Sequence, residues 1–160
     1  MFWRLTDARK RWSRVKGAPN QQAFRKLVKS GKAHGILALD DREPVGWCSF
    51  GPKAHFPGLE TTRSYRTESA AGLWAINCFY LVKEYRRIGL GQLLAGEAVK
   101  AIRRRGGKIV EAYPVTLTRN GKRLPPAFSF TGPEVIFTRL GFKEVQRLAP
   151  SRPVYRLDLG

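Results

Sequence analysis

Short apolar runs bounded by polar turns predict the strands of this protein. Residues 35–39 and 44–50 are two such runs on either side of a polar turn at 40–43, a pattern typical of an antiparallel hairpin. Residues 73–82 form the longest nearly apolar run, which only Asn77 interrupts. A run that is apolar on both faces predicts a strand in the centre of a sheet.

Helical spacing follows this strand directly. Leu, Ala and Ile recur every three or four positions within 89–105, and Gly106-Gly107 comes next, so the pattern predicts an amphipathic helix that ends there. A second strand is predicted at 108–113, where Pro114 closes it. Strand, tight turn, helix and strand make a βαβ unit, whose two strands must lie parallel in one sheet.

Shorter elements flank this unit. Asn20 is expected to cap a helix over 21–30, and Thr131–Glu134 matches a capping box that opens a helix ending at Leu140. The remaining segments are predicted to be two strands, 142–148 and 154–159, and two long loops, 53–72 and 115–130. Because hairpin strands surround one parallel unit, we expect an α/β fold, a mixed central β-sheet with helices on both faces.

The organisation of the chain is simple. No repeat, low-complexity tract or linker divides the sequence, so we predict a single domain over residues 1–160. The longest apolar run is about half of what a bilayer span needs, and no apolar segment follows the basic start. We therefore expect a cytoplasmic protein with no membrane partner. Cys48 and Cys78 are predicted to be reduced, buried thiols, and the spacing of Cys and His offers no metal site.

The charge balance is extreme. Thirty Lys and Arg face 12 Asp and Glu, which gives a formal net charge of +18. Such a field attracts polyanions, whether nucleic acid, a membrane surface or a phosphorylated cofactor. The basic residues are denser at 9–16 and 103–105 but are spread along the whole chain, which favours general basicity over one dedicated groove.

The turn between the central strand and the long helix carries the most informative residues, Arg86-Arg87-Ile88-Gly89-Leu90-Gly91-Gln92. Glycine at 89 and 91 allows a sharp turn and brings bare backbone close to a ligand. The helix that follows presents unpaired N–H groups and the positive end of its dipole, beside two arginines. The combination predicts a site for a diphosphate.

This interpretation has two kinds of alternative. The turn could bind another phosphate ligand, or it could simply begin a helix after two glycines and bind nothing. A P-loop needs GxxxxGK[ST], which is absent, and a dinucleotide fingerprint needs a third glycine where Leu94 stands. Glu111 does lie near the spacing of a ribose-binding acid, so a nicotinamide enzyme stays an alternative. Against it, the dinucleotide fold repeats its βαβ unit and this chain shows one.

The motif Arg86-x-x-Gly89-x-Gly91, in its strand-to-helix context, resembles the turn of the GNAT superfamily of acetyl-CoA-dependent N-acetyltransferases. The likeness extends through Cys78-Phe79-Tyr80-Leu81, Glu111-Ala-Tyr-Pro-Val115 and Phe137-Thr-Arg-Leu-Gly-Phe142. It is nearest to a bacterial branch with an E-G/A-Y-P-V strand end. The resemblance implies a GNAT-like three-layer fold, although the opening strand and helix of the family are missing, replaced or supplied by a partner.

The resemblance also implies how the cofactor, acetyl-CoA (coenzyme A), is bound. The implied cofactor-binding residues are Phe79, Leu81, Arg86, Arg87, Gly89, Leu90, Gly91 and Gln92. Backbone groups of Phe79 and Leu81 would pair with the pantetheine arm, and the amides from 87 to 92 would hold the pyrophosphate. An N–H on this strand would polarise the thioester carbonyl, and the amine would attack it directly.

Two proton transfers complete that chemistry. Many members have a tyrosine acid where Phe137 stands, so another group or water must protonate the thiolate. Glu111 is the candidate base and Tyr113, on the same side of its strand, the candidate acid. The alternatives are a salt-bridge partner for Glu111 and a packed aromatic for Tyr113.

The predicted function is therefore acetyl transfer from acetyl-CoA to an amine acceptor that the sequence does not identify. The alternative from a different class is a basic nucleic-acid-binding protein that keeps a GNAT-like fold without catalysis, suggested by the +18 charge. An enzyme that acetylates an RNA- or ribosome-associated amine would reconcile the two. A missing first strand would leave a sheet edge that favours a dimer.

Overall fold

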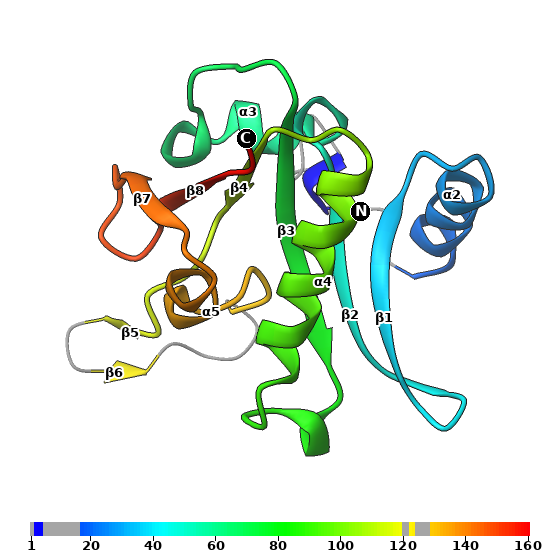
Figure 1. The fold of residues 1–160 in the computed structure, drawn as a ribbon. Coiled ribbons are helices and arrows are strands. Elements are labelled where there is room, and N and C mark those ends of the chain that lie inside the picture. The colour runs from blue at the N-terminus through cyan, green and yellow to red at the C-terminus, as the bar shows by residue number, and fades with distance from the viewer. Residues whose placement is uncertain (1, 5–16, 120–121, 124–128) are drawn as a thin grey trace.

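A mixed six-stranded sheet forms the centre of the computed structural model, which describes residues 2–4, 17–119, 122–123 and 129–160. The strands lie in the order β1-β2-β3-β4-β8-β7 (Figure 1). They are β1 His34–Asp40, β2 Glu43–Pro52, β3 Leu73–Leu81, β4 Ile109–Ala112, β7 Lys143–Gln146 and β8 Val154–Asp158. A separate ribbon pairs β5 Thr118–Arg119 with β6 Lys122–Arg123.

Helices cover both faces of this sheet. The α-helices are α2 Ala18–Lys29, α3 Pro57–Thr61, α4 Leu90–Arg104 and α5 Glu134–Arg139. The 3₁₀ turns are η1 Phe2–Arg4, η2 Lys53–His55, η3 Arg63–Tyr65 and η4 Lys83–Tyr85. β1 and β2 form the predicted antiparallel hairpin, and β3 and β4 flank α4 and pair in parallel. The predicted βαβ unit and mixed sheet are therefore confirmed.

Two separate cores hold the layers together. The larger core lies between the sheet and α4, where the apolar stripe Leu94, Ala98 and Ile102 is buried against β2 and β3. The smaller core lies on the other face, where Trp3 and Leu59 from η1 and α3 pack on the sheet. Figure 1 shows α4 lying along one face of β3 with α5 beside it.

Both predicted side-chain caps are wrong. Gly17 is the N-cap of α2, and Asn20, expected to cap it, is buried within the first turn. A proline in that first turn supplies the fixed φ that suits a helix start. Pro133 is the N-cap of α5, and the Oγ1 of Thr131 is buried without a hydrogen-bond partner among the described residues. Neither helix has a side-chain cap, and α5 is held instead by the burial of Phe137 in the larger core.

The long segment at 53–72 is not an irregular loop. It folds into η2, α3 and η3, which lie over the smaller core. The predicted patch at 9–16 lies outside the described residues, and so does part of the loop at 115–130. Within the described residues, no strand pairs with the outer edge of β1.

Three further sequence predictions concern thiols, metals and membranes. Both cysteines are free: Cys48 is fully buried and Cys78 half-buried, and burial raises the pKa of each thiol. The described residues contain no cluster of three or more His, Cys, Asp or Glu that would hold a metal ion. In the same part of the chain, no helix has the length and apolar character that crossing a membrane requires.

Candidate active site

The turn that enters α4 has the backbone geometry of an anion site. Gly89 is the N-cap of α4 with φ 90°, in the left-handed region that favours glycine. Arg87 also has a positive φ, 69°. The N–H of Gln92 donates to the carbonyl of Gly89 at 3.0 Å, so this amide is used within the helix. The N–H groups of the residues before it belong to the first turn, which has no helical acceptors of its own.

The second glycine of the motif serves packing. A Cβ on Gly91 would lie 3.0 Å from the Cδ1 of Ile136 in α5 and 3.6 Å from a methyl group of Leu81. Gly91 is buried, whereas Gly89 has open space around it. The two glycines therefore have different roles: Gly91 brings α4 against α5 and β3, and Gly89 sets the turn.

The arginines and the preceding turn are fastened to the sheet. The Nε of Arg86 donates to the carbonyl of Leu81 at 2.9 Å, which fixes the direction of the turn. The hydroxyl of Tyr85 donates to the carboxylate of Asp40 in the β1–β2 hairpin. Arg86 and Arg87 are both exposed. Their charges lie beside the N-terminus of α4, where the helix dipole also favours an anion.

β3 and β4 separate near this turn. Their parallel pairing ends at Ile76 and Ala112, while β3 continues to Leu81. Residues 129–133 bridge the two strand ends. The N–H of Phe79 donates to the carbonyl of Phe130 at 2.6 Å, and the N–H of Val115 donates to that of Gly132 at 2.9 Å. One of the N–H groups on the 79–81 strand, from which the thioester-polarising donor is expected, is thus bound to a carbonyl of this segment.

A β-bulge lies at the start of this gap. Ser49 pairs with Cys78 and Phe50 with Ile76, which leaves Asn77 as the extra residue on β3. The carbonyl of Asn77 accepts from the indole of Trp3 at 3.2 Å. Its side chain is 2% exposed, and its Nδ2 has no hydrogen-bond partner among the described residues. The sequence signal for this residue was its position as the one polar residue in an apolar strand. No function was predicted for Asn77 from that signal.

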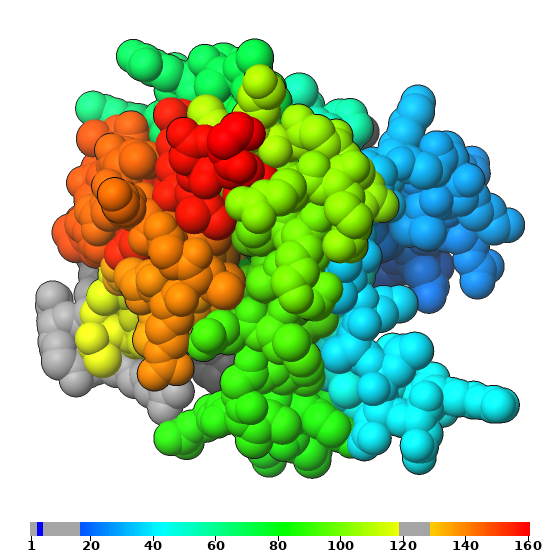
Figure 2. Space-filling model, viewed as in Figure 1, coloured from blue at the N-terminus to red at the C-terminus, as the bar shows by residue number. Residues whose placement is uncertain are grey.

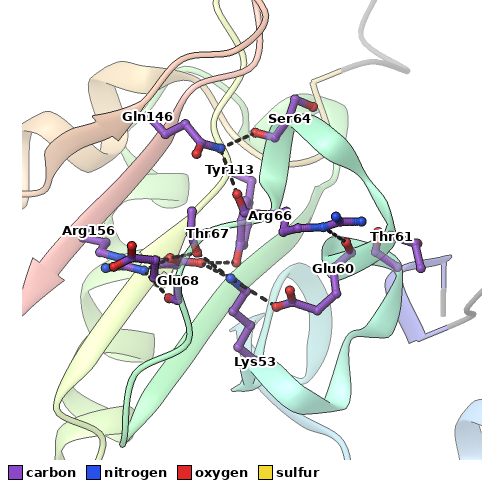
Figure 3. A network of polar contacts seen from close by, with 12 residues as sticks. Lys53, Glu60, Thr61, Ser64, Arg66, Thr67, Glu68, Tyr113, Gln146 and Arg156 are labelled. Carbon is purple, nitrogen blue, oxygen red and sulfur yellow. Dashed lines mark hydrogen bonds and ion pairs between the residues drawn. The ribbon is translucent and has the colours of Figure 1, made fainter.

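The buried carboxylate of Glu111 lies on the other face of the sheet, one residue before the β3–β4 pairing ends. Figure 3 shows the polar side chains that gather there, among them Lys53, Thr67 and Tyr113. Oε1 of Glu111 accepts from the Thr67 hydroxyl at 2.5 Å and from Nε of Arg156 at 2.8 Å. Oε2 accepts from the Tyr113 hydroxyl at 2.6 Å and lies 3.0 Å from Nζ of Lys53. Glu111 and Tyr113 therefore lie on the same side of β4, as their spacing predicts.

The chain is similar to known acetyltransferases in both sequence and structure. The family model for the acetyltransferase (GNAT) family matches residues 3–122. The chain belongs to this family. Membership confirms the predicted enzyme class, an acetyl-CoA-dependent N-acetyltransferase, and the fold agrees with it. Comparison with curated protein sequences yields no match.

Three solved structures illustrate the shared GNAT fold. A GNAT-family acetyltransferase from Desulfovibrio desulfuricans has a TM-score of 0.59 and 19% identity, over 94% of this chain and 89% of its own. An N-acetyltransferase from Thermoplasma acidophilum, solved with coenzyme A, gives 0.54 and 16%, over 87% and 70%. A ribosomal-protein-alanine N-acetyltransferase from Brucella melitensis gives 0.55 and 17%, over 88% and 76%.

The GNAT acid position is apolar here, as the sequence indicates. Phe137 is fully buried, with its ring 6.1 Å from that of Phe79 and 5.3 Å from that of Phe142. It cannot donate a proton.

The contacts of Glu111 and Tyr113 oppose the predicted proton transfers. Burial raises the pKa of Glu111, but donors from Thr67, Tyr113 and Lys53 outweigh it and hold the pKa below its ordinary value. A carboxylate held in its charged form is a weak base. Burial and the neighbouring Glu111 raise the pKa of Tyr113 well above its ordinary value, and the hydroxyl is fully buried. Their assignment as base and acid stays a prediction.

Proposed function

We propose that this chain acetylates an amine with acetyl-CoA bound in the gap between β3 and β4. The observation that carries the proposal is that β3 continues past its partner toward the N-terminus of α4. A strand edge without a partner strand offers peptide groups to an extended arm once the 129–133 bridge releases it, and the helix N-terminus offers amides to a diphosphate. Gly89, Leu90 and the amide of Arg87 would face the diphosphate, with the charges of Arg86 and Arg87 beside it.

Two buried polar atoms support an amide-containing ligand in this gap. The Nδ2 of Asn77 and the Oγ1 of Thr131 have no hydrogen-bond partner among the described residues, although both side chains are buried. An unsatisfied buried polar group costs about 1–3 kcal/mol. The pantetheine arm of coenzyme A carries two amides, which would supply partners for both residues. Asn77 and Thr131 are therefore proposed to bind the arm.

Binding requires one exchange within the chain. The N–H of Phe79 must release the carbonyl of Phe130 before it can donate to the acetyl carbonyl. The segment at 129–132 would then move away from β3, and the backbone of Phe79 and Leu81 would pair with the arm instead. Cofactor binding and the position of this segment are thereby coupled.

The chemistry then needs a charge stabiliser and a route for one proton. Acetyl-CoA supplies the acetyl thioester. Attack by the amine nitrogen forms the C–N bond and breaks the C–S bond, and one proton passes from the nitrogen to the sulfur. The N–H of Phe79 stabilises the negative charge on the carbonyl oxygen, a contribution of about 10²–10³ in rate for one such donor. Glu111 and Tyr113 are the predicted proton carriers.

Calorimetric titration of the purified protein with acetyl-CoA tests this function, with NADH as the control ligand. Saturable binding of acetyl-CoA and none of NADH is the expected result. Release of free CoA thiol in the presence of a panel of small amines and basic peptides then identifies the acceptor. Binding of NADH instead of acetyl-CoA would contradict the proposal.

A further inference from the structure

A basic pocket lies at the end of the molecule remote from the acetyl-CoA turn. It has a volume of about 290 Å³ and lies between the start of β1 and the C-terminal end of α4. Figure 2 shows the green α4 beside the blue and cyan segments that hold α2 and β1. The side chains of His34, Arg104 and Arg105 line it, together with Phe50. Because α4 has 15 residues, about 22 Å of helix separates this pocket from Gly89.

Two stretches of sequence without any acidic residue meet at this pocket. Residues 17–39 include α2 and the start of β1 and carry four Lys or Arg and no Asp or Glu. Residues 98–110 include the C-terminal half of α4 and carry five Lys or Arg and again no acid. These basic residues are all exposed: Arg25, Lys26, Lys29, Lys32, Lys100, Arg103, Arg104, Arg105 and Lys108. Among these residues Lys100 pairs with Glu97, so the surface around the pocket has a large excess of positive charge rather than an unbroken one.

The pocket is built around a fixed guanidinium. Nη1 of Arg105 donates to the carbonyl of Ala101 at 3.1 Å, and its Cζ lies 5.8 Å from the centroid of the Phe50 ring. Arg104, next to it, makes no hydrogen bond or ion pair within the described part of the chain. An arginine held in place beside one that is free to turn is a suitable pair for a phosphate.

His34 reports the same positive potential. Its ring stacks on Phe50 with centroids 5.8 Å apart and planes 26° apart. Burial, followed by the charge of Arg105, lowers the pKa of His34. Phe50 is 1% exposed, so the half-buried ring of His34 and the adjacent guanidinium groups are the planar groups on which a nucleobase could stack.

We propose that this pocket and its basic rim bind single-stranded nucleic acid, with one phosphate held between Arg104 and Arg105. The exposed lysines beyond the pocket can contact further phosphates, which a nucleic-acid strand provides at intervals and a single free phosphate does not. A bilayer surface cannot follow a concave pocket. The site is separate from the acetyl-CoA turn, so both ligands can be bound together.

The test is fluorescence anisotropy of a short labelled single-stranded RNA with the full chain. Arg104→Ala/Arg105→Ala is compared with Arg42→Ala/Arg139→Ala, which removes the same charge from the tip of the β1–β2 hairpin and from α5. We expect about a tenfold loss of affinity in the first pair and less than about twofold in the second. The slope of log K against log salt should fall by about 0.7, because the variant loses the one phosphate contact that the two arginines share and each contact on a single strand contributes about 0.7.

The outcomes distinguish RNA binding at the Arg104/Arg105 pocket from non-specific electrostatic attraction to a basic protein. Equal losses in the two pairs, or no saturable RNA binding near 100 mM salt, would overturn the proposal. Binding to anionic lipid vesicles that the Arg104/Arg105 pair abolishes, with RNA binding unchanged, would overturn it in favour of a membrane. Because Arg105 also contacts the core ring of Phe50, Arg104→Glu is the second variant. It should weaken RNA binding at least as much while acetyl-CoA binding and Tm stay unchanged.

Discussion

The two faces of the sheet are built on different physical principles. On the α4 face, apolar side chains at regular spacing bury each other, and the helix N-terminus offers backbone amides to a ligand. On the opposite face, a single carboxylate, Glu111, joins segments from distant parts of the chain. Lys53 and Thr67 come from the 53–72 segment that lies over the smaller core, and Arg156 comes from β8.

The difference concerns which interactions organise each face. Residues close together in the chain form the proposed anion site at the Arg86–Gln92 turn. The network around Glu111 is long-range, and it fixes the 53–72 segment. Nη2 of Arg156 donates to the carbonyl of Glu68 at 2.8 Å, and Nζ of Lys53 lies 3.2 Å from Glu60. The Glu111 face thus holds the 53–72 segment over the smaller core, whereas the α4 face provides the proposed cofactor site.

Removal of the Glu111 carboxylate should cause the largest loss of stability on either face of the sheet. Glu111→Ala leaves the buried Lys53 and the Arg156 guanidinium without their shared partner. Breaking a buried pair in this way typically costs about 3–5 kcal/mol. Urea unfolding should show a decrease of this size in the free energy of unfolding, and the 53–72 segment should become sensitive to proteases.

The milder variant Glu111→Gln separates the structural role from the catalytic one. It keeps the shape and some hydrogen bonds, so it should fold at low temperature. A structural Glu111 predicts that folded Glu111→Gln keeps kcat within about tenfold. A loss of kcat of about 10²–10⁴ in the folded variant would instead establish Glu111 as the general base.

Gly89→Glu should give the next largest effect, on the α4 face. The substitution forces a side chain into the left-handed region and places a negative charge at the diphosphate site. We expect a loss of acetyl-CoA affinity of at least about 100-fold by calorimetry, equivalent to about 2.7 kcal/mol.

The same helix provides a matched control. Gly106, beyond the other end of α4, also has a positive φ, 76°, and open space around a Cβ. Gly106→Glu should therefore cause similar backbone strain without loss of acetyl-CoA binding. Equal loss of binding in both variants would mean that strain, and not the diphosphate site, explains the result.

The sequence predicts the α4 face well because its signals are local. The apolar stripe of α4, the Gly89 turn and the parallel β3–β4 pair all follow from residues close together in the chain. The Glu111 network does not, because Lys53 and Arg156 lie 58 and 45 positions away along the chain. The sequence suggests a salt-bridge partner for a carboxylate in this strand, but it does not show which lysine or arginine that partner is.

The bridge at 129–132 was also beyond prediction. The contact between Phe79 and Phe130 joins two backbones, so no side-chain pattern encodes it. The failed capping box has a similar explanation, because Thr131 lies in this bridge and its buried hydroxyl does not cap α5. Local motifs lose their predictive value where a segment is held by tertiary contacts.

Acid should weaken the Glu111 face selectively. The donors around Glu111 hold its pKa below the ordinary value of 4.5. A lowered pKa contributes stability that is present above the unfolded pKa and lost as pH falls through the folded one. The free energy of unfolding should therefore decrease below about pH 4.5, and less so in Glu111→Gln. Because Glu134 also has a lowered pKa, the variant should keep part of the decrease. Identical pH profiles for the two proteins would contradict the role of Glu111.

The smallest effect on stability is expected for the Lys100–Glu97 ion pair, although its two charged atoms are closer together than those of Lys53 and Glu111. Nζ of Lys100 lies 2.7 Å from Glu97, closer than the 3.0 Å between Lys53 and Glu111. The Lys100 and Glu97 side chains are 65% and 39% exposed, however, whereas those of Lys53 and Glu111 are 5% and 0% exposed. Water competes for the exposed charges and salt screens them. Lys100→Ala should leave Tm unchanged within error, and a shift comparable to that of Glu111→Gln would show that proximity rather than burial determines what an ion pair contributes here.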